Sequence, residues 1–132
     1  MTGRRTWPLP ATVDTEALIF YLRQHTVGLL AGTAAIDLLA GHRTWLSRPD
    51  FRHHIHLSPA TTDLPVAWID WRTAVAALGR GQLPCSTSEA AVLRIAAALG
   101  ADIPVHLRQL LCSLDQHTIA LVTTAITDAN GA

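Results

Sequence analysis

The feature that most constrains the fold of this chain is the helical spacing of its apolar side chains between glycine and proline residues. The segment that ends at Gly100 shows the pattern best, since one face of it carries Val92, Ile95, Ala96 and Leu99. Ser86 and Glu89 stand ahead of that face at the spacing of a capping box, in which each side chain bonds the other residue's backbone N–H. The segment therefore predicts an amphipathic helix with both ends defined.

The same pattern predicts further helices along the chain. Their candidate first residues or caps are Asp14, Thr33, Asp70, Pro104 and Asp115. The helix from Thr33 either runs through Gly41 to Trp45 and Leu46 or breaks at Gly41, and the sequence leaves both open. In the first helix the apolar stripe includes Leu18, Leu22, His25 and Leu29, and in the last one the inward residues are Ile119, Val122 and Ile126.

Residues 52–69 depart from the helical pattern. His54 and His56 alternate with Ile55 and Leu57, which is the two-residue period of a strand, and residues 66–69 alternate in the same way. Turn-forming residues at 58–65 separate the two runs and predict a β-hairpin, which must pack on helices or pair with another chain to be stable. We therefore expect a mainly α fold, a compact bundle of about five to six short helices with one β-hairpin at residues 52–69.

The length of 132 residues suits a single domain with its own core. Pro8 and Pro10 predict an extended N-terminal arm over residues 1–12, followed by one mainly helical domain at residues 13–132. Hydrophobic residues make up 49% of the chain and charged residues only 15%, so some apolar surface is expected to stay exposed. Self-association hides such surface, and we expect a homodimer.

No segment indicates export or a membrane. Arg4 and Arg5 are not followed by an apolar run, and the apolar region at residues 17–40 is interrupted by charged side chains. Cys85 and Cys112 lack the spacing of a zinc or redox motif, which favours reduced thiols. We therefore expect a cytoplasmic protein that does not bind membranes.

Two clusters could carry a binding function. The first is the His-x-His pair His54 and His56, whose imidazoles would point the same way on a strand, as two ligands of one metal do. The third ligand would come from a residue without fixed spacing to the pair, namely His42, Asp50, Asp63 or His25. A pH-sensitive surface is an alternative of similar weight to a metal site, and the sequence favours the polar outer face of a hairpin over both.

The second cluster is the basic stretch at residues 42–54. Arg43, Arg48 and Arg52 are interleaved there with Trp45 and Phe51, and such a mixture can hold single-stranded nucleic acid by charge and stacking. The chain as a whole has ten basic and ten acidic residues, which argues against a nucleic-acid binder, and its last helix lacks the lysines and arginines of a recognition helix. The two aromatics are also typical of core residues.

Catalytic motifs such as a nucleophile elbow or a phosphate-binding glycine loop are missing from the sequence. Cys85 precedes a predicted helix N-terminus, which can lower a thiol pKa, and His106 or His117 would then be its base. The alternative is a structural thiol. The sequence favours a protein without enzymatic activity, and no cofactor is expected.

Most of residues 34–131 resemble a group of small actinobacterial proteins. The residues that carry the resemblance are Trp45-Leu46, Asp50-Phe51, Asp70-Trp71, Leu83-Pro84-Cys85-Ser86, Glu89, residues 93–97, Pro104-Val105, Leu107-Arg108 and Leu114-Asp115 with the helix that follows. The chain departs from the group's pattern at His106, where the group has an acidic residue. No activity is attached to the group, so the resemblance implies an intact fold in a bacterial cytoplasm and no catalytic residue.

These observations favour a non-enzymatic protein-interaction module that binds itself or an unidentified protein. Trp7, Trp45 and Trp68 are the predicted interface anchors, because buried aromatic side chains dominate binding energy at interfaces. Nucleic-acid binding through residues 42–54 and metal binding at the His-x-His pair remain the alternatives.

Overall fold

A computed structural model describes residues 7–8, 13–58 and 65–131 of the chain. It confirms the expected mainly helical bundle with one β-hairpin. The described helices are α1 (Thr15–His25), α2 (Leu30–His42), the short 3-10 turn η1 (Trp45–Ser47), α3 (Pro49–Arg52), α4 (Trp71–Gly79), α5 (Thr87–Ala101), α6 (Leu107–Leu111) and α7 (Gln116–Asn130). The described strands are β1 (Trp7–Pro8), β2 (Ile55–Ser58) and β3 (Val66–Ile69).

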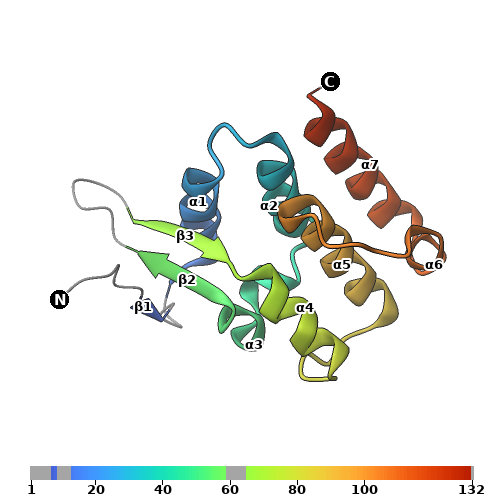
Figure 1. Ribbon diagram of the computed structural model, residues 1–132, viewed down its shortest axis with the longest axis horizontal. Helices are drawn as coiled ribbons and strands as arrows, with labels where there is room; N and C mark the ends of the chain where they lie inside the picture. Colours follow the sequence, from blue (N-terminus) through green and yellow to red (C-terminus); the bar gives the residue numbers. More distant parts are fainter. Residues whose placement is uncertain (1–6, 9–12, 59–64, 132) are drawn as a thin grey trace.

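Helix α2 lies at the centre of the molecule, between α1 and α7 (Figure 1). It packs most extensively against α7 and α5, while α1 covers β3 and α4 packs on α5. This central position agrees with its sequence, since α2 is apolar nearly all round and buries Ala34, Ala35, Ile36, Leu38 and Leu39.

The hairpin forms as expected and is supported by α1. Strands β2 and β3 pair antiparallel, with Ile55 opposite Ile69 and His56 opposite Trp68. The short strand β1 adds to the other edge of β2, where Trp7 is opposite Leu57. The rest of the predicted arm at residues 1–12 lies outside the described residues, so the arm stays a prediction.

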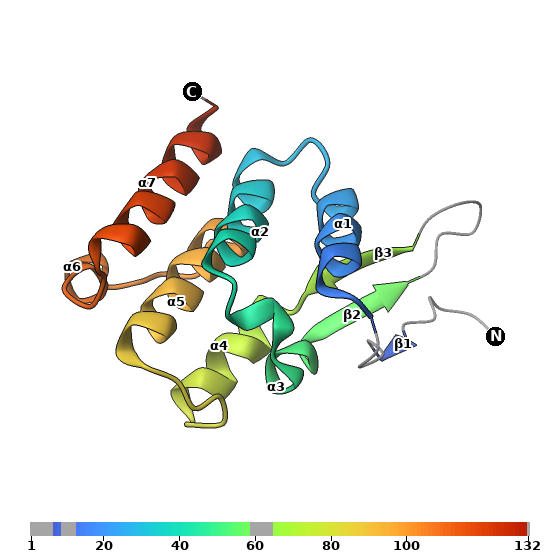
Figure 2. The same ribbon diagram turned by 180° about the vertical axis from the view of Figure 1, so that it is seen from behind.

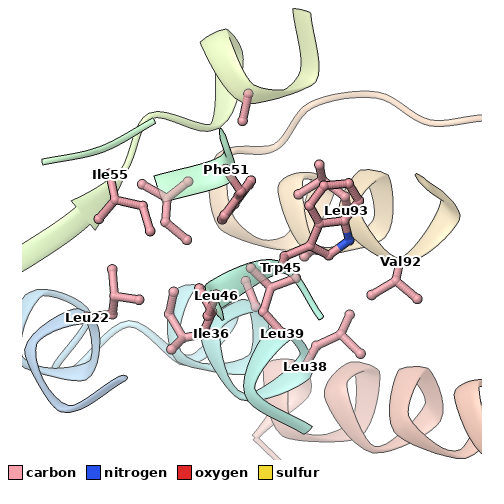
Figure 3. Close-up of a cluster of buried hydrophobic side chains, with 14 of the residues drawn as sticks. Leu22, Ile36, Leu38, Leu39, Trp45, Leu46, Phe51, Ile55, Val92 and Leu93 are labelled. Atoms are coloured by element: carbon pink, nitrogen blue, oxygen red, sulfur yellow. The ribbon is translucent and has the colours of Figure 1, made fainter. Parts of the chain in front are cut away.

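The core is built around Trp45 and Phe51 (Figure 3). Both side chains are fully buried, and their ring centroids lie 5.5 Å apart. The indole N–H of Trp45 donates a hydrogen bond to the backbone oxygen of Glu89, at 3.0 Å. This bond holds the η1 turn against α5. Because Trp45 packs there, the chain ends α2 at His42 and turns toward α5.

The helix ends follow the predicted caps in part. Asp70 and Asp115 cap α4 and α7 through their side chains, and Ser86 and Glu89 form the complete capping box of α5. The prediction for Pro104 was wrong, because α6 begins only at Leu107. Helix α2 runs through Gly41, as one alternative had it, but ends at His42 and does not reach Trp45.

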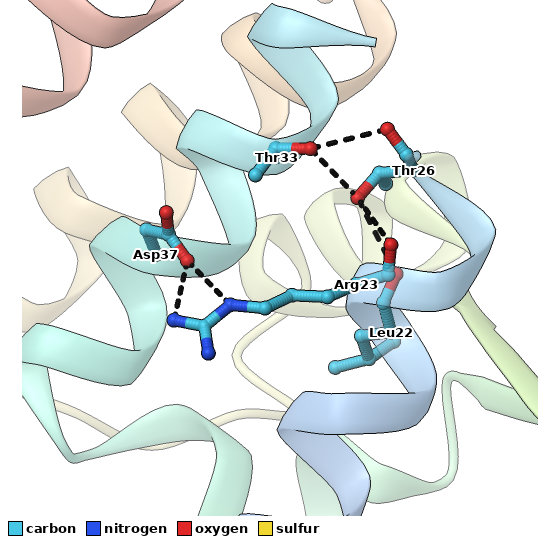
Figure 4. Close-up of polar contacts among 5 residues, drawn as sticks. All are labelled: Leu22, Arg23, Thr26, Thr33 and Asp37. Carbon is cyan, nitrogen blue, oxygen red and sulfur yellow. Dashed lines mark hydrogen bonds and ion pairs between the residues drawn. The ribbon is translucent and has the colours of Figure 1, made fainter. Parts of the chain in front are cut away.

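The prediction that Thr33 caps α2 was also wrong. Helix α2 begins at Leu30, and the Thr33 hydroxyl instead donates to the backbone oxygen of Thr26, at 3.1 Å (Figure 4). Arg23 and Asp37 form an ion pair further along the same two helices, at 2.7 Å. These contacts hold the end of α1 against the start of α2, so the short loop between them is fixed at both sides.

Candidate interaction surface

The most exposed large hydrophobic side chains of the described residues gather at one end of the molecule. Val27 is 71% exposed, Leu29 59%, Leu30 58% and Ile126 51%. Val27 and Leu29 belong to the α1–α2 connection, Leu30 is the first residue of α2, and Ile126 belongs to α7. Figures 1 and 2 show that connection beside the C-terminal end of α7. A methyl group placed on Gly131 would lie 3.2 Å from Leu30, which confirms that the two segments touch. We call these four residues the loop-end patch.

Charged side chains are sparse in the two segments that carry the loop-end patch, and the nearest one along α7 is Asp128. No Asp, Glu, Lys or Arg occurs from Gln24 to Ile36, and none occurs from Gln116 to Thr127. The cores of protein interfaces show the same depletion of charged residues. An exposed apolar surface in an uncharged frame is therefore the feature of this molecule that best fits a binding site for protein.

A pocket of about 130 Å³ adjoins the patch. Leu29 belongs to both, and the pocket walls also include Leu22, His25, Trp68 and Trp71. Its volume exceeds the roughly 30 Å³ that one water molecule occupies in the liquid, so it has room for a small apolar group. The α1–α2 loop thus carries exposed apolar side chains at this end of the molecule, and the pocket beside it forms a recess.

The shape of this pocket depends on close packing around its tryptophans. The ring of Trp68 lies against those of His25 and His56, with centroids 5.7 Å and 5.6 Å away. A methyl group on Gly100 would come within 2.6 Å of the Trp71 indole, so only glycine allows that ring to lie where it does. The pocket wall is thus set by packing contacts between α1, β3, the start of α4 and the end of α5.

The three tryptophans predicted as interface anchors have different environments in the structure. Trp45 is buried in the core and has no surface to offer a partner. Trp68 is half-buried and lines the pocket beside the loop-end patch. The side chain of Trp7 lies outside the described residues, so its role stays a prediction.

The predicted basic cluster is not gathered on one surface. Arg43 is exposed at the end of α2, whereas Arg48 is bonded to Asp50 at 2.9 Å and lies over the Trp45 ring. That ion pair raises the pKa of Arg48 and lowers the pKa of Asp50.

Arg52 is 8% exposed, and its guanidinium donates to the backbone oxygens of Leu46 and Val13 and to the Thr15 hydroxyl. Two of the three arginines are therefore engaged within the fold.

His54 and His56 do not lie on the same face of one strand, as the sequence predicted. Strand β2 begins at Ile55, so His54 lies in the turn before it, where its Nδ1 is 3.1 Å from the Thr73 hydroxyl. His56 is on the strand and stacks on Trp68. No group of three His, Cys, Asp or Glu side chains suited to a metal occurs among the described residues, and Asp63 lies outside them.

Cys85 shows no sign of activation as a nucleophile. It is half-buried, and burial, with a smaller contribution from Glu89, raises the pKa of its thiol. Its proposed bases His106 and His117 are both exposed on other elements. The geometry around Cys85 is that of a structural thiol.

His42 is the last residue of α2, and its Nδ1 is buried with no hydrogen-bond partner among the described residues. Burial lowers the pKa of His42, and nearby His117 lowers it further, while Glu89 and Asp115 act in the opposite direction. Protonation therefore favours the unfolded chain, whose histidines titrate near pH 6.5.

We expect the free energy of unfolding to be highest above about pH 6.5 and to fall as the pH drops through the lowered pKa of His42. Urea denaturation at about pH 7.5 and about pH 5.5 should show this loss, and His42→Gln should reduce it. Part of the loss should remain, because burial also lowers the pKa of His54. The control is His106→Gln, an exposed histidine. An unchanged pH dependence in His42→Gln would contradict the assignment.

No protein family, curated protein or solved structure matches this chain. The resemblance of residues 34–131 to small actinobacterial proteins accordingly remains an expectation. Among the described helices, none has the length and apolar character needed to cross a bilayer. A functional proposal for this chain therefore rests on the geometry of its described residues.

The loop-end patch was missed by the sequence analysis. Leu29 was assigned to the inward stripe of the first helix, and Ile126 to the inward face of the last. Helix α1 ends at His25. Helix α7 buries Val122 as expected, but its other buried residues are Thr118 and Ala125, and Ile119 and Ile126 are exposed. Gly28 was a signal in the sequence that the helix ends before Leu29, and in the structure it adopts a positive φ of 84°.

Proposed function

We propose that this protein is a non-enzymatic interaction module that forms a homodimer through the loop-end patch. The observation that carries the proposal is the gathering of four largely exposed aliphatic side chains, Val27, Leu29, Leu30 and Ile126, in an uncharged frame. Monomeric proteins rarely leave such side chains together in water. We place the dimer in the cytoplasm, because both cysteines are free thiols.

A second copy of the chain is the partner that fits this patch best. In a two-fold symmetric dimer the same surface meets itself, so any charge in it faces a like charge near the axis. The loop-end patch avoids that penalty because it has no charged residue. It also offers both a projecting loop and an adjoining pocket, so the Val27 side of each loop can approach the pocket of its partner.

The energy of such a dimer must come from several side chains together. Burying one aliphatic side chain contributes about 1.5 to 3 kcal/mol when it is fully exposed at the start, and these four are only partly exposed. Association costs at least about 4 kcal/mol in lost translational and rotational freedom. Eight such side chains, four from each protomer, can offset an association cost at this lower bound with little to spare, so a single charged substitution should suffice to break the interface.

We expect Val27→Asp to convert the dimer to a monomer, because it places a carboxylate in the apolar interface and another one in the partner's copy. Light scattering coupled to size-exclusion chromatography measures the mass directly. Val27 is 71% exposed in the protomer, so the variant should fold normally.

The matched control is Leu107→Asp. Leu107 is an exposed leucine on α6. Figure 2 shows α6 beside the first turn of α7, at the far end of that helix from the patch. The substitution Leu107→Asp introduces the same carboxylate outside the patch and should leave the dimer intact. A dimer that survives Val27→Asp but dissociates with Leu107→Asp would move the interface to the α6 end and refute the proposal.

A further inference from the structure

A second pocket, of about 350 Å³, lies at the opposite end of α1 from the loop-end patch. The start of α1 contributes Asp14 and Thr15 to its walls, and the η1–α3 segment contributes Ser47, Arg52 and His53. Most residues of its wall are polar, with Val13 and Pro49 as the exceptions, whereas the pocket beside the patch is mainly apolar. Its volume is in the range of pockets that hold small molecules.

Arg52 gives the pocket a buried positive charge. Its three hydrogen bonds all go to neutral acceptors, two backbone oxygens and a hydroxyl. A guanidinium has five N–H groups, so two remain without a partner among the described residues. Arg52 forms no ion pair with any of the described residues. Asp63 is the only acidic residue of the sequence that lies outside them. A buried cation in this state is stabilised by an anionic group.

Asp14 gives the same pocket a negative charge. It occupies the N-cap position of α1, yet its carboxylate makes no capping bond to the helix. Within the described part of the chain it also forms no ion pair, with Arg52 or with any other residue. Arg52 and Asp14 therefore line one pocket with opposite charges that do not neutralise each other. A purely anionic ligand would be attracted by Arg52 but repelled by Asp14.

We propose that this pocket binds a small zwitterion such as a free α-amino acid, its carboxylate on Arg52 and its ammonium group on Asp14. The N-terminal end of α1, where Asp14 and Thr15 lie, adds a positive potential to the same pocket. The hydroxyls of Thr15 and Ser47 supply further polar contacts in the wall. This inference is independent of the dimer, because the pocket and the loop-end patch lie at opposite ends of α1.

The test is a titration of the full chain followed by NMR chemical shifts of backbone amides and of the Arg52 Nε–H. The probes are glycine and leucine as zwitterions, acetate and methylammonium as the two halves, and inorganic phosphate as a plain anion. We expect the zwitterions to shift the signals of Val13, Thr15 and Ser47 saturably, and to bind at least about tenfold more tightly than acetate. Equal binding of acetate and glycine, binding of phosphate in preference to both, or no saturable shift would overturn the proposal.

Asp14→Asn tests the ammonium contact without touching the core, since Asp14 is exposed and its carboxylate makes no capping bond to α1. It should remove the preference for glycine over acetate. The matched control is Glu16→Gln, which removes the same charge from the first turn of α1 at a residue outside the pocket wall. Loss of the preference in both variants would mean a general charge effect and would contradict a specific ammonium site.

Discussion

Trp45→Ala is expected to lower the free energy of unfolding by about 3 to 5 kcal/mol, which is the usual loss for a fully buried large aromatic side chain. Trp45 has no exposed surface, packs against Phe51 and bonds the backbone oxygen of Glu89. The substitution would leave a cavity between η1 and α5 and would remove the hydrogen bond from the indole to the Glu89 carbonyl. Urea denaturation followed by circular dichroism measures the change as a shift of the midpoint.

Trp45→Phe separates the contribution of ring packing from that of the indole hydrogen bond. It keeps much of the ring packing and removes the N–H, so we expect a smaller loss, of about 1 to 3 kcal/mol. The pair of variants also tests the place of Trp45 in the molecule. A Trp45→Ala protein that keeps its stability but changes its mass in solution would return Trp45 to the interface, against the burial seen in the structure.

Arg52→Met should produce the second large loss of stability, roughly 2 to 4 kcal/mol. Methionine keeps the apolar stem but removes the guanidinium that joins Leu46, Val13 and Thr15. The backbone oxygens of Leu46 and Val13 would then lose a charged donor in a largely buried place. Equilibrium unfolding in urea measures this loss as well.

The matched control for Arg52 is Arg43→Met. Arg43 is exposed at the end of α2, so its replacement should change the free energy of unfolding by no more than about 0.5 kcal/mol. If the two variants lost the same stability, Arg52 would not have the structural role that its three hydrogen bonds indicate. The comparison also separates the arginines that the sequence grouped together as one basic cluster.

The parts of the fold that depend on local sequence were predictable. Ser86 and Glu89 define the start of α5 because a capping box needs only residues three apart. The β2–β3 hairpin follows from alternating side chains on both sides of a turn-rich segment. Such signals are read from neighbours along the chain, so they do not require knowledge of the tertiary structure.

The surface was not predictable in the same way, because exposure depends on which face meets a neighbouring element. Ile126 has helical spacing to Val122, yet α2 covers Val122 and leaves Ile126 half exposed. Arg52 looks like a surface charge in the sequence, but its partners Val13 and Thr15 are almost forty residues away along the chain. The loop-end patch and the pocket beside Arg52 both arise from such long-range arrangements.

The most direct test of the central claim is the mass of the unmodified protein in solution. Sedimentation equilibrium over a wide range of concentrations, at neutral pH and in reducing buffer, should give twice the 14.2 kDa of one chain. A dimer that dissociates only on dilution would agree with an interface of this size. A mass of 14.2 kDa at every concentration would show that the loop-end patch does not bind a second copy and would contradict the proposed function.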